Sequence, residues 1–215
     1  MINFTNLPSE HAKIRGDLDR AIARVLDSSQ FVLGPEVTGF ERAFADYCGS
    51  EHAVAVNSGT SALHLALLAV GVEAGDEVIT VSMTFTATVA AVLLVGAVPV
   101  MVDVDPVYWT MDVSQIEAAI TDKTKAILPV HLHGLMADMS GIRHIAAKYG
   151  LAVIEDAAQA HGSERDGYAV GSLSEIATFS FYPGKNLGAF GDADGEEEGE
   201  DDYDEGGDAG GKDEL

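Results

Sequence analysis

Apolar residues recur at helical spacing through the first fifty residues of the chain. We expect a first helix over Glu10–Ser28, where Ile14, Leu18 and Ile22 fall on one side. A proline and a serine just before this stretch are a typical helix start signal. A second helix is expected over Val37–Tyr47, between a Gly-Pro break and a glycine.

From residue 52 onward, short apolar runs alternate with helical stretches. The runs expected to be strands are His52–Asn57, Glu77–Val81, Pro99–Val104, Thr124–Val130, Leu151–Glu155 and Ile176–Phe181. The stretches expected to be helices are Ala62–Val70, Thr86–Val95, Ser114–Ile120 and Ile142–Lys148. Because strands that alternate with helices form βαβ units, the expected fold class is α/β, with a mainly parallel sheet and flanking helices.

Polar residues that follow the strands are the candidates for chemistry. In parallel sheets of this kind, ligands sit beyond the carboxyl ends of the strands. The segments at these positions are Ser58–Ser61, Thr84-Phe85, His131–Gly134, Asp156–Gln159 and Ser180–Lys185. We therefore expect these segments to meet at one edge of the sheet.

The composition indicates a globular protein with an acidic end. Hydrophobic residues make up 47% of the chain, which is ordinary for a protein with a core. The formal net charge is -23, and residues 192–215 hold 13 of the 35 acidic side chains against one lysine. Since this segment has few apolar residues, we expect it to be disordered. Basic residues are not clustered, so nucleic acid is not an expected partner.

The sequence also predicts where the protein resides. Cys48 is the single cysteine, which excludes an intrachain disulfide and a C-x-x-C metal site and fits a reducing compartment. The N-terminus lacks the apolar core of a secretory signal, and the longest apolar run, Val89–Val102, is too short to span a membrane. The last four residues match an ER-retention address, which has nothing to act on without a signal peptide. We expect a cytoplasmic protein without a membrane partner.

Lys185 is the candidate nucleophile. It follows an apolar run and a Pro-Gly turn, which leave its amine little backbone cover. A partly desolvated amine loses its charge readily and can form a Schiff base with a carbonyl group. Taken alone, however, the same pattern is typical of a solvated surface lysine.

Three other features have a functional and an ordinary interpretation. Asn57–Ser61 joins a strand to a helix and either binds phosphate at the helix N-terminus or is a simple N-cap. Asp156 either holds a pyridinium or imidazolium proton, binds a metal, or caps a turn. Phe85 either stacks on a flat ring or packs in the core.

Taken together, these features fit pyridoxal 5′-phosphate (PLP). This cofactor needs an amine for its aldehyde, an acid for its ring nitrogen, an anion site for its phosphate and a flat surface for its ring. Lys185, Asp156, the 58–61 turn with Ser180, and Phe85 would supply them in that order.

Several motifs resemble the DegT/DnrJ/EryC1/StrS family of sugar aminotransferases from about residue 31 to residue 192. They are GPEVTGFERAFADYCG, NSGTSALHLALLAVGVEAGDEVI, MTFTATVAAVLLVGAVPVMVDVDP, LPVHLHG, EDAAQAHG and FSFYPGKNLGAFGD. The resemblance implies the fold-type I architecture of aspartate aminotransferase and a homodimer. It also implies transfer of an amino group, usually from glutamate, to a keto carbon of a nucleotide-linked sugar, for surface polysaccharide or secondary-metabolite biosynthesis.

The resemblance also implies roles for individual residues. Lys185 would form the Schiff base and move a proton between substrate and cofactor, and Asp156 would pair with the pyridinium nitrogen. The remaining cofactor-binding residues implied are Gln159 near the ring hydroxyl, Ser180, Gly59 and Thr60 at the phosphate, and Phe85 on the ring. His161 lies near the site without an assigned role, and Asp103 and Asp105 are interpreted as structural.

The sequence departs from the family after residue 192. Relatives continue with more sheet and a smaller C-terminal domain, whereas this chain continues with the acidic segment. We therefore expect a PLP-binding large domain over residues 1–191, incomplete and truncated before the small domain, and a tail over 192–215. The alternative is a catalytically inactive fragment. Dehydration of a keto sugar is a third reading, which Lys185 argues against because such relatives have His there, and an acidic interaction module is a fourth.

Overall fold

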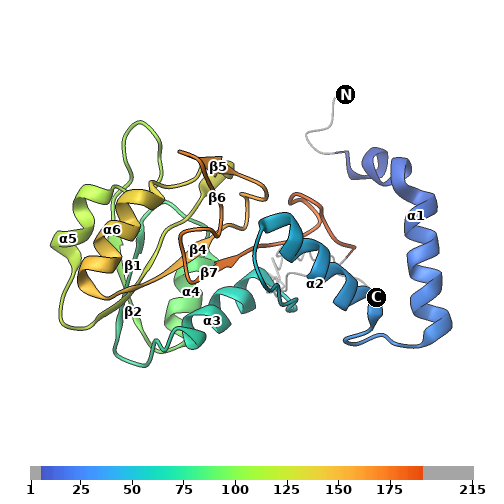
Figure 1. The fold of residues 1–215 in the computed structure, drawn as a ribbon, viewed down its shortest axis with the longest axis horizontal. Coiled ribbons are helices and arrows are strands. Elements are labelled where there is room, and N and C mark those ends of the chain that lie inside the picture. Colours follow the sequence, from blue (N-terminus) through green and yellow to red (C-terminus); the bar gives the residue numbers. More distant parts are fainter. Residues whose placement is uncertain (1–5, 191–215) are drawn as a thin grey trace, which may run out of the picture.

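Five parallel strands form the sheet at the centre of the molecule in the computed structural model, which describes residues 6–190 (Figure 1). The strands are β1 (Glu77–Val81), β2 (Val98–Val102), β3 (Thr124–Leu128), β4 (Ala152–Asp156) and β7 (Ile176–Thr178). Their order in the sheet is β2-β1-β3-β4-β7, and every neighbouring pair is parallel. The expected α/β fold class is confirmed.

Helices cover both faces of this sheet (Figure 1). The helices are α3 (Gly59–Ala69) and α4 (Thr86–Leu94) on one face, and α5 (Ile116–Ala119) and α6 (Met139–Tyr149) on the other. Successive strand residues point to opposite faces. Thus Val78 and Ile154 pack with α3 and α4, whereas Ile79 and Val153 pack with α5 and α6. Helices cover both faces, which is why apolar residues predominate in the strands.

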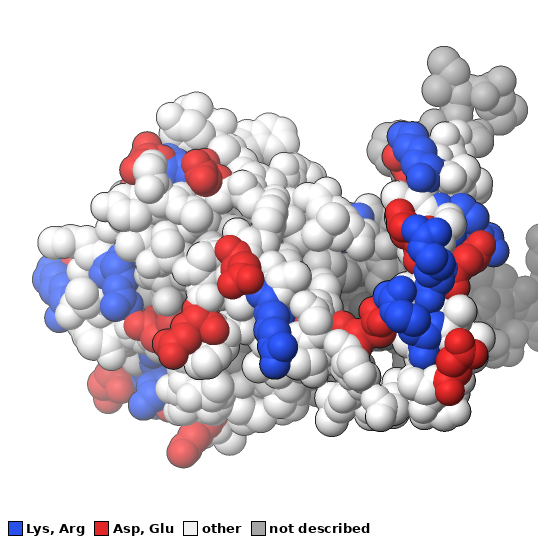
Figure 2. Space-filling model, turned by 45° about the vertical axis from the view of Figure 1, so that its right-hand side comes forward, with Lys and Arg blue, Asp and Glu red and all other residues white. Residues whose placement is uncertain are grey.

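Two further helices precede the sheet. They are α1 (Leu7–Ser28) and α2 (Pro35–Cys48). α2 contributes Phe44 and Ala45 to the buried interior, but α1 buries none of its residues and stands apart from the body (Figure 1). Acidic and basic side chains alternate along α1 (Figure 2), where Arg15 pairs with Asp19.

The strand expected over His52–Asn57 does not form. The Ala55 amide donates instead to the Glu41 carboxylate of α2, at 2.9 Å, and Val54 is 79% exposed. An alternating apolar run is enough to predict a strand from sequence. A strand also needs a neighbour that offers backbone donors and acceptors, and none within residues 6–190 pairs with this segment.

Other differences concern short elements. The helix expected over Ser114–Ile120 is a 3₁₀ turn, η1 (Val113–Gln115), followed by the single turn of α5, and the last strand ends at Thr178 rather than Phe181. A two-stranded hairpin, β5 (Glu164–Arg165) with β6 (Tyr168–Ala169), and a 3₁₀ turn, η2 (Leu132–Gly134), were not expected. Such pieces are too short to give a periodic pattern.

Two expectations concern the ends and the membrane. The domain boundary at residues 191 and 192 and the acidic segment after it lie outside the described residues. Among residues 6–190, no helix has the length and apolar character needed to cross a bilayer.

Candidate active site

A cavity of about 450 Å³ opens beyond the carboxyl ends of the strands. Ligand sites usually measure about 300–1,000 Å³. The first turns of α3 and α4 meet the segments that follow β3, β4 and β7 around this cavity. The structure thus brings together all seven residues singled out as cofactor-binding, namely Gly59, Thr60, Phe85, Asp156, Gln159, Ser180 and Lys185.

Lys185 lies in the turn that follows β7. Its backbone amide donates to the Tyr182 carbonyl oxygen at 2.7 Å, and its own carbonyl oxygen accepts from the Gly188 amide at 3.2 Å. These bonds hold the turn closed and leave the side chain half-buried. The Lys185 Nζ lies 5.9 Å from the centroid of the Phe85 ring, so an amine and an aromatic face share one wall of the cavity.

Asp156 ends β4 and is 5% exposed. Its Oδ2 accepts a hydrogen bond from Thr88 Oγ1 at 2.6 Å, and its Oδ1 accepts from the Ala158 amide at 3.2 Å. Burial raises the pKa of the Asp156 carboxyl, and the two hydrogen bonds oppose this effect. A buried carboxyl of this kind holds its negative charge best beside a cation.

Thr88 was missed by the sequence interpretation. It is fully buried within α4, and its hydroxyl contacts both Asp156 and Thr84 Oγ1, the latter at 2.7 Å. A threonine inside an apolar helix gives no signal of a contact with a residue 68 positions away. Only the packing of α4 on the sheet brings the two side chains together.

The N-terminus of α3 forms another wall. Ser58 is the N-cap, and its Oγ accepts from the Ser61 amide at 2.9 Å. Gly59 and Thr60 are the first helical residues and line the cavity, as does the buried Ser180. The N-cap interpretation of the 58–61 turn is therefore confirmed. A capped helix start also carries the positive end of the helix dipole, and phosphate binding here stays a prediction.

Gln159 and His161 differ in how they relate to the cavity. Gln159 lines it and accepts a hydrogen bond from the His133 amide at 2.8 Å. His161 packs against the rings of Phe44, Phe179 and Phe181, behind the cavity wall. Its two ring nitrogens are buried. Burial lowers the pKa of His161, an interaction with the Ser180 backbone opposes this shift, and the charge of Lys185 lowers the pKa further.

Three other observations complete the account of the expected residues. Asp105 accepts from the Val107 and Tyr108 amides, each at 2.8 Å, as its structural interpretation requires. His131, to which the sequence interpretation gave no role, lines the cavity. Within residues 6–190, no group of three or more His, Cys, Asp and Glu side chains is arranged to hold a metal ion.

Comparison with protein families shows to which family this chain belongs. The model of the DegT/DnrJ/EryC1/StrS aminotransferase family matches residues 12–194. The chain belongs to this family. The resemblance drawn from the motifs is therefore confirmed over almost the whole sequence.

The DegT/DnrJ/EryC1/StrS relatives include enzymes that act on nucleotide-linked sugars. One is the dTDP-3-amino-3,4,6-trideoxy-alpha-D-glucose transaminase of Streptomyces venezuelae, 51% identical over 191 residues, or 89% of this chain and 50% of that protein. The crystal structure of S. venezuelae DesV in complex with a ketimine intermediate has a TM-score of 0.86 and 50% identity, over 89% of this chain and 52% of that one. The chain spans about half the length of the curated relatives it matches.

The cavity of this aminotransferase-family chain fits PLP. It joins a lysine amine, a buried carboxyl suited to a cationic partner, a helix N-terminus and an exposed aromatic face. A related structure, NtdA from Bacillus subtilis with bound cofactor PMP, has a TM-score of 0.82 and 39% identity, over 88% of this chain and 43% of that one. PMP is the amino form of the same vitamin B6 cofactor.

Proposed function

We propose that the protein is a PLP-dependent aminotransferase. It moves an amino group from glutamate to a keto carbon of a nucleotide-linked sugar, in the biosynthesis of a surface polysaccharide or a secondary metabolite. The observation that carries the proposal is the convergence of Lys185, Asp156, Phe85 and the α3 N-terminus on one cavity. Family membership and the named sugar transaminases among the relatives support the choice of substrate.

The seven residues expected to bind the cofactor have distinct tasks in this reaction. When bound, PLP supplies the aldehyde that takes up the amino group and the ring that absorbs the electron pair released at the substrate carbon. The Lys185 amine provides the covalent attachment point and a base that moves a proton. Asp156 would hold a proton on the ring nitrogen, Gln159 would lie near the ring hydroxyl, and Phe85 would cover the ring.

The phosphate of the cofactor would be held by Gly59, Thr60 and Ser180. A helix N-terminus attracts anions because its amides point outward and the helix dipole is positive there. α3 is 11 residues long, enough for this effect, and Ser58 fixes its first turn. These residues would hold the cofactor in the cavity independently of its attachment to Lys185.

Borohydride reduction tests the assignment of Lys185. Reduction of the PLP-loaded protein should fix the cofactor permanently to one peptide, which mass spectrometry identifies as the one containing Lys185. We expect Lys185→Ala to abolish the label and the visible absorbance. Lys123→Ala, which changes a lysine outside the cavity, should keep both. A Lys185→Ala protein that is still labelled would refute the assignment.

A second candidate function is a cofactor-binding chain without turnover. The exposure of the cavity rim favours it, because Phe85 is 51% exposed and amino transfer requires water to be excluded. Addition of glutamate to the PLP-loaded protein distinguishes the two candidates. An aminotransferase loses the borohydride label and releases 2-oxoglutarate, whereas a chain without turnover keeps the label.

We also propose that the protein is a cytoplasmic homodimer. The support for a homodimer is the family resemblance together with several large apolar side chains that are exposed in the single chain. The single cysteine fits the reducing cytoplasm.

A further inference from the structure

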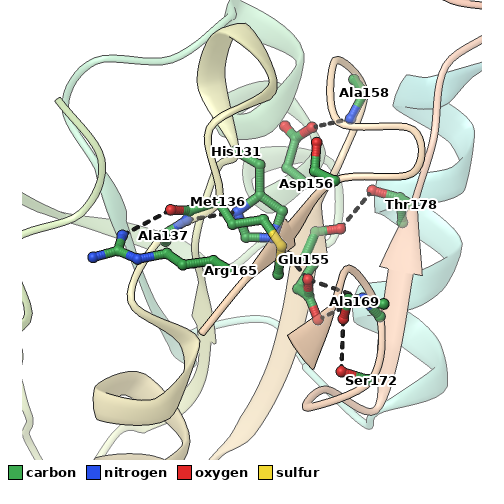
Figure 3. A network of polar contacts seen from close by, with 12 residues as sticks. His131, Met136, Ala137, Glu155, Asp156, Ala158, Arg165, Ala169, Ser172 and Thr178 are labelled. Carbon is green, nitrogen blue, oxygen red and sulfur yellow. Dashed lines mark hydrogen bonds and ion pairs between the residues drawn. The ribbon is translucent and has the colours of Figure 1, made fainter. Parts of the chain in front are cut away.

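A histidine and a glutamate form a buried pair beneath the cavity. His131 follows β3, Glu155 belongs to β4, and the two side chains are 0% and 1% exposed. His131 Nε2 lies 2.7 Å from Glu155 Oε2. His131 also lines the cavity, next to Asp156 (Figure 3). Polar side chains are costly to bury, so their hydrogen bonds must offset the free energy lost on leaving water.

The surrounding bonds fix the tautomer of His131. The Ala137 amide donates to His131 Nδ1 at 3.1 Å, so Nδ1 carries a lone pair rather than a proton. The ring is therefore neutral, and its single proton lies on Nε2 and is donated to Glu155. Glu155 also accepts from the Gly171 amide, at 3.2 Å to Oε1 and 3.1 Å to Oε2. This set of donors is that of an ionised carboxylate.

Hydrogen bonds with the neighbouring segments hold the backbone on both sides of Asp156. The His131 amide donates to the Asp156 carbonyl oxygen at 3.0 Å, and the Asp156 amide donates to the Pro129 carbonyl oxygen at 2.9 Å. Thr178 Oγ1 donates to the Glu155 carbonyl oxygen at 3.1 Å. The carboxylate of Asp156 thus extends from a peptide segment that is tied to the strands on either side of it.

We infer that His131 is a positioning residue for Asp156, acting as a neutral imidazole that Glu155 and the Ala137 amide hold in one tautomer. The inference rests on the proposed PLP site, in which Asp156 faces the ring nitrogen. The imidazole fixes the floor of the cavity and the end of β4.

A purely structural role for the pair makes a different prediction. If His131 only stabilised the fold, its replacement would lower stability without changing how the site treats the ring nitrogen. The two roles are separated by comparing PLP with its analogue in which a CH group replaces the ring nitrogen. Only PLP can place a protonated nitrogen against Asp156, so the ratio of the two affinities measures that contact.

Two variants of His131 separate its two hydrogen bonds. The amide oxygen of Asn occupies roughly the place of Nδ1, so His131→Asn keeps the bond from Ala137 and loses the one to Glu155. The amide nitrogen of Gln reaches roughly to the place of Nε2, so His131→Gln keeps the bond to Glu155. We expect His131→Asn to lower the preference for PLP over the analogue by about tenfold, the size of one charge-assisted hydrogen bond. His131→Gln should retain more of the preference for PLP over the analogue than His131→Asn does.

Thr80→Val is the matched control. Thr80 is fully buried in β1, its Oγ1 donates to the Leu128 carbonyl oxygen at 2.8 Å, and it does not line the cavity. We expect this variant to lose stability and to keep the wild-type preference. If His131→Asn also keeps the preference, His131 does not position Asp156. If the wild-type protein forms no adduct with PLP at Lys185, the proposed function itself fails.

A second measurement applies if the His131 variants do not fold. Nitrogen NMR of the wild-type chain, with ¹⁵N-labelled histidine and without cofactor, reports the protonation of both ring nitrogens of His131. We expect the neutral Nε2–H tautomer at neutral pH. An Nδ1–H tautomer or an imidazolium would overturn the inference.

Discussion

Asp156 shows how burial and function oppose each other at a single residue. Its carboxyl lies between the sheet and α4, at the wall of the cavity. Burial raises the pKa of this carboxyl despite the hydrogen bonds from Thr88 and the Ala158 amide. Without a ring nitrogen against it, an ionised Asp156 therefore destabilises the folded chain, although the charge of Lys185 offsets part of this penalty. A protonated ring nitrogen against the same carboxyl would stabilise its ionised form.

This opposition predicts the effect of Asp156→Asn on stability. Because the folded-state pKa is raised, the folded chain binds the proton more tightly than the unfolded chain does. The resulting penalty is absent below the unfolded pKa of about 3.9, grows as the pH rises through the folded pKa, and stays constant above it. We expect Asp156→Asn to be more stable than the wild type at neutral pH without cofactor, with a difference that disappears in acid. Urea denaturation at a series of pH values measures it.

Excess PLP provides the control for this prediction. Ligand binding to the folded state stabilises the wild type by mass action, so PLP should shift the wild-type midpoint more than that of Asp156→Asn. A variant that is less stable than the wild type at neutral pH without cofactor would show that the carboxyl supports the fold instead of opposing it.

Sequence reasoning found the site residues that directly follow an expected strand. Lys185 and Asp156 each follow an apolar run, and the rule that ligands sit beyond strand ends was enough to select them. Thr88 and Glu155 were not found, because each lies within an expected helix or strand and not in the segment that follows a strand. Their function depends on partners from other elements, which periodicity does not reveal.

Among the elements, α1 contributes least to the packed body. Its 22 residues include none that is buried, although Ile14, Ile22 and Leu26 give it an apolar side. Its contacts with the rest of the chain include the ion pair between Arg24 and Glu36, which is exposed to solvent. The helix is well patterned yet has no surface to pack against in the described chain.

We therefore expect the removal of α1 to have a small effect on the unfolding free energy. We expect a chain without residues 1–28 to retain the unfolding free energy of the body to within about 1 kcal/mol, because surface changes rarely cost more. Urea denaturation of both chains, with equal slopes, checks this value. A loss of several kcal/mol would mean that the apolar side of α1 is covered in solution.

The strands show where sequence-based prediction of elements reaches its limit. Glu77–Val81 was predicted with its exact bounds, since its apolar run is flanked by glycine and polar residues and buried on both faces. His52–Asn57 has a similar run but no pairing partner within residues 6–190. Pairing is a property of two segments, so the pattern of one segment cannot supply it.

For the molecule as a whole, the exposed apolar side chains are the feature to explain. The most exposed, each at least 60% exposed, are Leu26, Phe31, Val32, Leu33, Val54, Leu94, Val107, Leu187 and Phe190. Large apolar patches on soluble proteins usually mark interfaces, and most oligomers are symmetric dimers.

The proposed homodimer gives this surface a testable role. We expect sedimentation of the intact protein to give twice the mass of one chain, and we expect Val32→Asp to shift it toward one chain because burying a charge is costly. Asp122→Asn, a change at an exposed residue that is already polar, should leave the mass unchanged. Sedimentation as a single chain at micromolar concentration would contradict the homodimer.

Trp109, finally, gives the molecule a built-in optical reporter. It is the only tryptophan in the sequence and lies in a small hollow that shares Leu132 with the cofactor cavity. Indole emission overlaps the near-ultraviolet absorption of a pyridoxal chromophore, so energy transfer over this short span dims the fluorescence as the site fills. The fraction of sites occupied by the cofactor can thus be followed in unlabelled protein from the loss of tryptophan fluorescence.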